Sequence, residues 1–235
     1  MTGQGFVASM AALYRVGTQG DLCGPMLSAL PVNGVAISTL GDPFGSETVC
    51  ASDDAAARLD EIQLDLGEGP CWEALRTSSP VMEPDVQSAT SDRWPLALGA
   101  MRETRLGAVF AFPMTVGPID VGAVDLYNEH PGSLTPSAVR DATAMAGVVA
   151  RNVLHRALLR SEHDGSPGDQ DGGRYSRREV HQASGMIAAQ TGAGAADALL
   201  LLRAFAHTAG RPVLDLAADV IARRVDFTDH DPSDT

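Results

Sequence analysis

Apolar residues recur at helical spacing in three successive stretches near the C-terminal end of the chain, between residues 174 and 227. In the first stretch, Val180, Ala183 and Ile187 fall on one face of a helix. Two further stripes repeat this spacing: Ala198, Leu202, Phe205 and Ala209, then Val213, Leu216, Ala217, Val220 and Ile221. The pattern predicts a module of three short helices around one small core. A module of this size has little room for chemistry, so we interpret it as an output device that the rest of the chain controls.

Helical and strand patterns alternate in the first part of the chain, separated by turn residues. The predicted elements are a helix over residues 20–30, strands over 35–40 and 47–51, and a helix over 55–63. Asp53 and Asp54 are placed to cap that last helix. After a turn with two glycines, Pro70 can open a short helix that carries Cys71 and Trp72 inward.

The middle of the chain adds more strands and a long helix. The predicted elements are a helix over residues 93–102, strands over 107–114 and 119–127, and a helix from 135 to 160. Thr135 is suited to the N-cap of the long helix and Pro136 to its first position. Together with the earlier elements, these predict an α+β fold. The apolar stripe in the second half of the long helix could pair with another chain, so we expect a homodimer.

The helical pattern breaks at residues 161–173, which contain four acids, no basic residue and almost nothing apolar. This composition is typical of a flexible linker. We therefore expect a first domain over residues 1–160, a linker over 161–173, the three-helix module over 174–227, and a disordered acidic tail over 228–235.

Charge is distributed unevenly between these parts. The whole chain has a formal net charge of −13, whereas residues 174–227 carry 7 Arg against 5 acids. A polyanion is repelled by the body of such a protein and tolerated only at the module. No apolar run approaches the roughly 18 to 20 residues that span a bilayer, and no basic residue precedes Arg15. We expect a cytoplasmic protein with no membrane partner.

Cys23, Cys50 and Cys71 are an odd number of cysteines with no Cys-x-x-Cys spacing, so we expect free thiols and no metal site. Cys71 and its neighbour Trp72 are candidate ligand-binding residues, although a single cysteine in apolar surroundings is more often buried and inert. No pair of carboxylates is recognisably placed for catalysis, and Glu68 and Glu73 have the pattern of surface charges.

Residues 1–158 resemble a GAF domain, of the divergent kind found in actinobacterial two-domain regulators. The segment from Gln63 to Cys71 is the most specific part of the match. The other matching positions are Leu59 to Ile62, Val81, Asp85, Arg93-Trp94-Pro95, Gly122-Ala123-Val124-Asp125-Leu126-Tyr127 and Leu134-Thr135-Pro136. The resemblance implies an antiparallel sheet flanked by helices, with a possible small-molecule ligand. The identity of a cofactor stays unknown, because GAF pockets hold cyclic nucleotides, haem, bilins or nothing.

The C-terminal module resembles an ANTAR domain, an RNA-binding unit of transcription antitermination regulators. The matching positions are Arg177, Val180, Gln182-Ala183, Gly185, Ala198, Leu202-Arg203, Ala206, Arg211, Asp215 and Leu216-Ala217. Three departures stand out: Ser184 occupies a position where the family usually has Lys, Gly194 replaces the usual Ser or Thr cap of the second helix, and Gly210 replaces a polar residue expected near the end of that helix. These departures imply reduced or differently tuned affinity for RNA.

Two faces of the first module helix can be separated on a helical wheel. Val180, Ser184 and Ile187 fall on one side, and Arg178, Gln182 and Gly185 fall on the other. An exposed glycine inside a helix costs about 1 kcal/mol relative to alanine. Either an RNA backbone or another helix approaches it closely. With the resemblance, we expect RNA contacts from Arg177, Arg178, Gln182, Ser184, Gly185, Ala189 and Arg211.

The sequence therefore predicts a non-enzymatic, signal-responsive RNA-binding regulator that acts by transcription antitermination and recognises hairpins in nascent RNA. Two alternatives remain open. Some GAF folds reduce oxidised methionine with cysteine thiols, so three cysteines keep a thiol-based reductase or redox sensor in consideration. In the second alternative, the three helices form a dimer or partner-protein surface rather than an RNA-binding one.

Overall fold

A computed structural model describes residues 3–17, 20–41, 43–90, 92–163 and 177–228 of the chain. The fold divides into two compact units, residues 1–171 and 172–235, each with its own core. We describe the two units separately.

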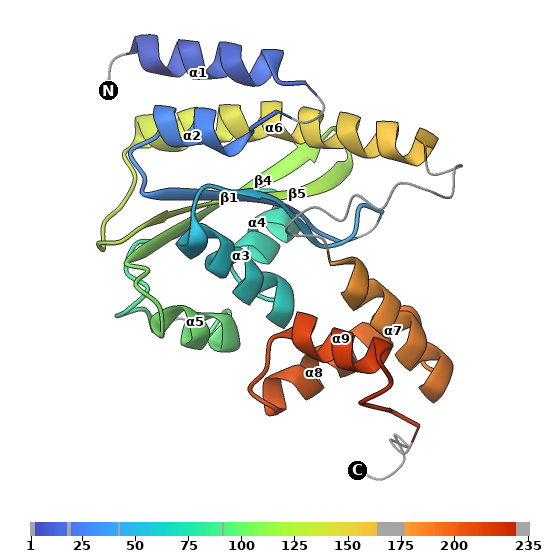
Figure 1. The fold of residues 1–235 in the computed structure, drawn as a ribbon. Helices are drawn as coiled ribbons and strands as arrows, with labels where there is room; N and C mark the ends of the chain where they lie inside the picture. The colour runs from blue at the N-terminus through green and yellow to red at the C-terminus, as the bar shows by residue number, and fades with distance from the viewer. Residues whose placement is uncertain (1–2, 18–19, 42, 91, 164–176, 229–235) are drawn as a thin grey trace. The chain divides into compact units, whose positions relative to one another are not determined.

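The first unit is built on a five-stranded antiparallel sheet with strand order β2-β1-β5-β4-β3 (Figure 1). The strands are β1 (Gly34–Thr39), β2 (Glu47–Ala51), β3 (Val81–Glu83), β4 (Ala108–Val116) and β5 (Ile119–Asn128). Strands β1 and β5, the first and the last in chain order, pair directly, with Ala36 opposite Asp125. This pairing needs a close approach at Gly122 (φ +157°), where a Cβ atom would lie 1.9 Å from the carbonyl oxygen of Ser38.

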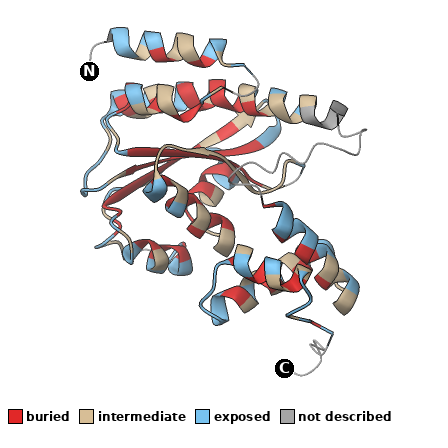
Figure 2. Cartoon of the chain, in the orientation of Figure 1, coloured by how far each residue is buried: buried red, intermediate tan, exposed pale blue. Residues whose placement is uncertain are grey.

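Helices cover both faces of this sheet (Figure 1). On one face, α2 (Cys23–Ala29) and α6 (Pro136–His163) lie against the strands, and α1 (Gly3–Arg15) packs on these two helices. On the other face, α3 (Asp54–Leu66) and α4 (Pro70–Thr77) lie against the strands, and α5 (Pro95–Arg102) packs on α3. Side chains alternate between the two layers along each strand. On β4, Phe110 packs against the first group of helices while Val109 and Ala111 pack against the second. Figure 2 shows the resulting buried sheet between two half-exposed helical layers.

The local predictions for this unit are largely confirmed. The α+β fold, its antiparallel sheet and the flanking helices are all present. Asp53 accepts a hydrogen bond from the Ala56 amide at 2.8 Å and caps α3, and Thr135 accepts one from the Ala138 amide at 3.2 Å. The sequence pattern did not predict α1 or the three-residue strand β3. Short strands bounded by proline, as β3 is, carry too few residues for a periodic signal.

The cysteine prediction is wrong for two of the three residues. Cys23 on α2 and Cys50 on β2 form a disulfide, and only Cys71 is free. The pair is separated by 27 residues in sequence. Spacing along the chain cannot reveal such a pair, because it forms only when α2 packs on the sheet beside the edge strand β2.

The predicted linker begins too early. Helix α6 continues to His163, so residues 161–163 are helical rather than part of a linker. The remainder of the predicted linker and the tail from residue 229 lie outside the described residues.

The second unit consists of α7 (Arg178–Thr191), α8 (Ala195–Thr208) and α9 (Val213–Ile221), as the apolar spacing predicts. Their inward faces form one core, to which Phe227 adds an edge-to-face contact with Phe205 at 5.3 Å. The stripes are confirmed except at the end of α8, where Ala209 is exposed. Gly194 is the N-cap residue of α8 and provides no side-chain hydrogen bond, as the departure from the family pattern predicts.

Within the described part of the chain, no single helix is both long and apolar enough to cross a membrane. Helices α7 and α8 meet the length and composition criteria only as a pair, and they are bent by 105° at their junction.

Candidate functional site

A cluster of buried polar side chains lies between the sheet and α3. Asp60 of α3 accepts a hydrogen bond from the Ser38 hydroxyl at 2.6 Å and another from the Thr48 hydroxyl of the edge strand. One turn further along α3, the side-chain amide of Gln63 donates to Asp125 of β5 at 2.9 Å. Ser38, Asp60, Gln63 and Asp125 are all at most 1% exposed. The cluster ties α3 to three strands of the sheet.

Gln63 also connects this cluster to the start of α4. Its side-chain oxygen accepts from the Cys71 amide at 2.8 Å, and its backbone oxygen accepts from the Trp72 indole N–H at 2.8 Å. Gly69 must be a glycine here, since it has φ +136° and a Cβ atom would lie 2.6 Å from the Gln63 oxygen. Gly67, the other glycine of the Gln63-to-Cys71 segment, ends α3 in the left-handed conformation with φ +67°.

Asp125 has a described hydrogen-bond partner for only one of its two carboxyl oxygens. Its Oδ1 atom is buried and has no hydrogen-bond partner among the described residues. Burial raises the pKa of the Asp125 carboxyl well above its usual value, the charge of Asp60 raises it further, and the Gln63 hydrogen bond lowers it. The folded protein therefore holds the proton of this carboxyl more tightly than the unfolded chain does.

An open cavity of about 470 Å³ lies beside the same turn, outside the sheet. Its lining comes from the turn before α4, from α4 itself and from the start of α5: Gly67, Glu68, Gly69, Trp72, Glu73, Arg76, Arg93 and Trp94. Of the two predicted ligand-binding residues, Trp72 lines this cavity, whereas Cys71 is fully buried and does not.

The two glutamates that the sequence pattern placed at the surface hold the walls of this cavity together. Glu73 accepts from Arg93 at 2.8 Å and from the Trp94 indole N–H at 2.6 Å, which joins α4 to α5. Glu68 accepts from the backbone amides of Leu96 and Ala97 and caps α5 from a distant turn. Sequence reasoning missed both roles because the partners lie 20 to 29 residues away in the chain.

The second unit presents four of the predicted RNA-binding residues on one exposed face of α7. Arg178, Gln182, Gly185 and Ala189 are all exposed, at positions that recur every three to four residues. The core of the module lies on the opposite side of this helix. We refer to these four residues as the α7 face.

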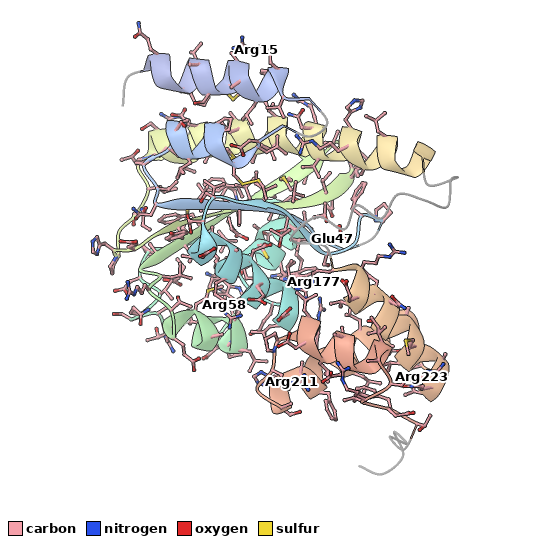
Figure 3. The ribbon with its side chains drawn as sticks, viewed as in Figure 1. Arg15, Glu47, Arg58, Arg177, Arg211 and Arg223 are labelled. Carbon is pink, nitrogen blue, oxygen red and sulfur yellow. A yellow bond between two sulfur atoms is a disulfide. The ribbon has the colours of Figure 1, made fainter. Side chains whose placement is uncertain are left out.

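The other three predicted RNA-binding residues lie elsewhere. Arg177 is only 5% exposed. Ser184 is also buried, and its hydroxyl donates to the Val180 carbonyl of its own helix at 2.8 Å. Arg211 is exposed in the turn before α9, where it pairs with Asp219 at 2.7 Å (Figure 3). The structure therefore brings together four of the seven candidates and separates three.

The fold agrees with the comparison to known families. The family model of the GAF domain matches residues 10–153, more than half of the chain. The chain belongs to the GAF domain family. Residues 175–221 match the ANTAR domain, so the second unit carries an ANTAR domain. The resemblances to a GAF domain and to an ANTAR domain are confirmed, and the actinobacterial type stays a prediction.

Solved GAF structures share this fold at low sequence identity. The GAF domain of a phosphoenolpyruvate-protein phosphotransferase from Coxiella burnetii is 14% identical, with a TM-score of 0.52 over 67% of this chain and 95% of that chain. The corresponding domain from Acinetobacter is 12% identical, with a TM-score of 0.51 over 71% of this chain and 96% of that chain. A search of curated proteins found no match.

The chemistry available inside the GAF domain is limited. Burial raises the pKa of the Cys71 thiol well above its usual value, and the charges of Asp125 and Asp60 raise it further. A thiol in this setting is a poor nucleophile, because the thiolate is the reactive form. Among the described residues no group of His, Cys, Asp and Glu side chains is arranged to hold a metal ion.

Proposed function

We propose that this GAF–ANTAR protein is a signal-responsive regulator of transcription antitermination, of the type found in actinobacterial two-domain regulators. An ANTAR domain implies RNA binding in antitermination, and a GAF domain implies a sensory role. In this proposal the GAF domain senses a small molecule or a partner, and the α7 face contacts a hairpin of the nascent transcript. The ANTAR domain indicates a regulator rather than an enzyme.

The proposal that the α7 face contacts RNA rests on Gly185. A Cβ atom at this position would meet nothing within 4 Å among the described residues, so no neighbouring helix requires a glycine here. Glycine nevertheless costs about 1 kcal/mol of helix stability relative to alanine. Close approach of an RNA backbone, with Arg178 and Gln182 beside it, explains why a residue without a side chain stands at this position. The alternative that Gly185 accommodates helix packing within the module has no support in its surroundings.

The charge of the ANTAR domain suggests that one copy binds RNA weakly. Residues 174–227 carry 7 Arg against 5 acids, and Asp219 engages both Arg211 and Arg224. Few cationic side chains are thus available to displace counterions from RNA phosphates. A homodimer with two ANTAR domains would compensate by raising the effective concentration of the second contact.

Electrophoretic mobility shift at low salt, with RNA leaders that contain two hairpins, tests the proposal. We expect the wild-type protein to shift the RNA, and Arg178→Ala and Gly185→Leu to weaken the shift strongly. Two control substitutions make the same changes away from the α7 face. Arg105→Ala removes an exposed arginine of the GAF domain, and Gly99→Leu makes the glycine-to-leucine change at an exposed position of α5, where an added Cβ atom also meets nothing within 4 Å. Absence of any wild-type shift, or equal loss in the controls, would contradict the proposal.

The Cys23–Cys50 disulfide favours a second candidate function, a thiol-based redox sensor. In that case the reduced and oxidised proteins differ in RNA binding, and a Cys23→Ser/Cys50→Ser variant resembles the reduced protein under all conditions. A mobility shift measured with and without dithiothreitol tests this candidate. Equal RNA affinity in both redox states would exclude the redox-sensor function. A methionine sulfoxide reductase activity that these substitutions abolish would instead support the enzymatic alternative.

A further inference from the structure

We propose that the cavity between α4 and α5 binds a small planar monoanion, such as an aromatic carboxylate, with Arg76 pairing the carboxylate and Trp72 contacting the ring. The inference rests on the proposed sensory role of the GAF domain and supplies the chemical class of its ligand.

The size of the cavity suits such a ligand. Its volume of about 470 Å³ lies within the range of roughly 300 to 1,000 Å³ that is typical of small-molecule sites. Two tryptophans contribute to its walls, and tryptophan provides a large flat surface for an aromatic ring. Trp72 is half-buried and lines this cavity.

The acidic side chains of the cavity are already engaged by the protein. Both oxygens of Glu73 accept hydrogen bonds, one from Arg93 and one from Trp94. Glu68 accepts from the two free amides at the start of α5. Their charges are therefore largely offset by donors of the protein itself, and they do not require a cationic ligand.

The two arginines of the cavity differ in availability. Arg93 is paired with Glu73 at 2.8 Å and lies over the Trp94 ring at 4.5 Å. Arg76 is exposed in the last turn of α4 and forms no ion pair with any described residue. Its guanidinium presents a planar set of donors that matches a carboxylate in a bidentate pair. One available cation favours a ligand with one negative charge.

The binding surface is held in place before any ligand arrives. The Trp72 indole N–H donates to the backbone of Gln63 at 2.8 Å, which fixes the orientation of the ring. Gln63 in turn holds the Gly69 turn and the Asp125 side chain. Preorganisation of this kind reduces the entropy cost of binding. It also links the cavity directly to the central strand β5, through which a bound ligand can influence the sheet.

Isothermal titration calorimetry of the full chain with 2-naphthoate tests the proposal, with the neutral 2-naphthamide and the dianionic 2-naphthyl phosphate as comparison ligands. We expect 2-naphthoate to bind best. Arg76→Gln should weaken its binding at least about tenfold, as expected for loss of a charged hydrogen bond. Arg105→Gln, the same change at another exposed arginine of this domain, should leave binding unchanged. Trp72→Phe retains a ring but loses the indole hydrogen bond, and should bind more weakly than wild type.

Three results would overturn the proposal: no heat of binding for 2-naphthoate at millimolar concentration, equal binding by Arg76→Gln, or equal binding of the amide. The RNA assay separates this proposal from the proposed function. If the protein shifts RNA but does not bind 2-naphthoate, only the proposed ligand class is excluded. If it binds 2-naphthoate but shifts no RNA, the antitermination role is excluded and the ligand site still stands.

Discussion

Asp125 shows how a single residue can depart from the pattern around it. It stands among apolar neighbours on β5, and the alternation of that strand places it on the face covered by α3. There it meets Gln63 on one oxygen and no described partner on the other. A buried carboxyl without full hydrogen bonding favours its protonated form.

Replacing Asp125 by Asn should change how stability depends on pH. The pKa of Asp125 is raised in the folded protein above the ordinary value of 3.8. Its contribution to stability is thus complete below pH 3.8 and is lost as pH rises through the raised pKa. Asparagine does not titrate, so the stability of Asp125→Asn relative to wild type should increase with pH from 4 upwards. Urea unfolding at several pH values between 4 and 8 measures this difference.

The exposed Asp120 of the same strand offers a matched control, because Asp120→Asn removes a carboxyl that is already in contact with water. Its stability difference from wild type should vary much less with pH. A difference for Asp125→Asn that stays constant across this range would contradict the role of burial.

The residue at position 185 should affect both the stability of the ANTAR domain and its RNA binding. Alanine at this position meets nothing within 4 Å, so Gly185→Ala should stabilise the ANTAR domain by up to about 1 kcal/mol while weakening RNA binding. Chemical unfolding followed by circular dichroism measures the stability. Gly192→Ala is the control with the opposite sign, because Gly192 ends α7 with φ +73° and alanine is strained there. A destabilised Gly185→Ala protein would show that a packing contact needs the glycine.

At the scale of elements, hydrophobic spacing was sufficient for most helices and strands. The three helices of the ANTAR domain and the cap of α3 follow from patterns within a few residues of each other. The disulfide and the Glu73 contacts could not be predicted in this way. Each joins elements that are remote in sequence, and only the packing of helices on the sheet determines which of their residues meet.

The disulfide between α2 and β2 should contribute substantially to stability. Closing a loop with a separation of 27 residues stabilises a fold by about 3.5 kcal/mol in the chain-entropy description. Cys23→Ser/Cys50→Ser should lose roughly this amount in urea unfolding, and dithiothreitol should destabilise the wild-type protein similarly. The double variant serves as its own control, since the reductant should not affect it further. A wild-type protein insensitive to reductant would show that the bond contributes little.

At the scale of the whole molecule, the proposed sensory role and the proposed RNA-binding role belong to regions of different net charge. The chain as a whole carries −13, while the module over residues 174–227 has an excess of arginine. Attraction of RNA is thus confined to the ANTAR domain, and its strength should depend on salt.

The salt dependence of RNA binding follows from this distribution. Each phosphate contact adds about 0.7 to 0.9 to the slope of log affinity against log salt concentration. Arg178→Ala should reduce that slope by about this amount, as measured by fluorescence anisotropy of labelled RNA over a salt series. Arg105→Ala changes the net charge equally but should leave the slope unaltered. An unchanged slope for Arg178→Ala would place the phosphate contacts elsewhere.

The amino-acid sequence by itself determined the α+β class, the two domains and the exposed face of α7. All three depend on periodicity and composition, which are local properties of the chain. Only the tertiary structure decided that Cys23 meets Cys50, that Asp60 and Asp125 share one buried cluster through Gln63, and that Arg76 and Trp72 face a common cavity. These arrangements depend on the pairing of β1 with β5 and on the packing of α3, α4 and α5, which no stretch of sequence specifies alone.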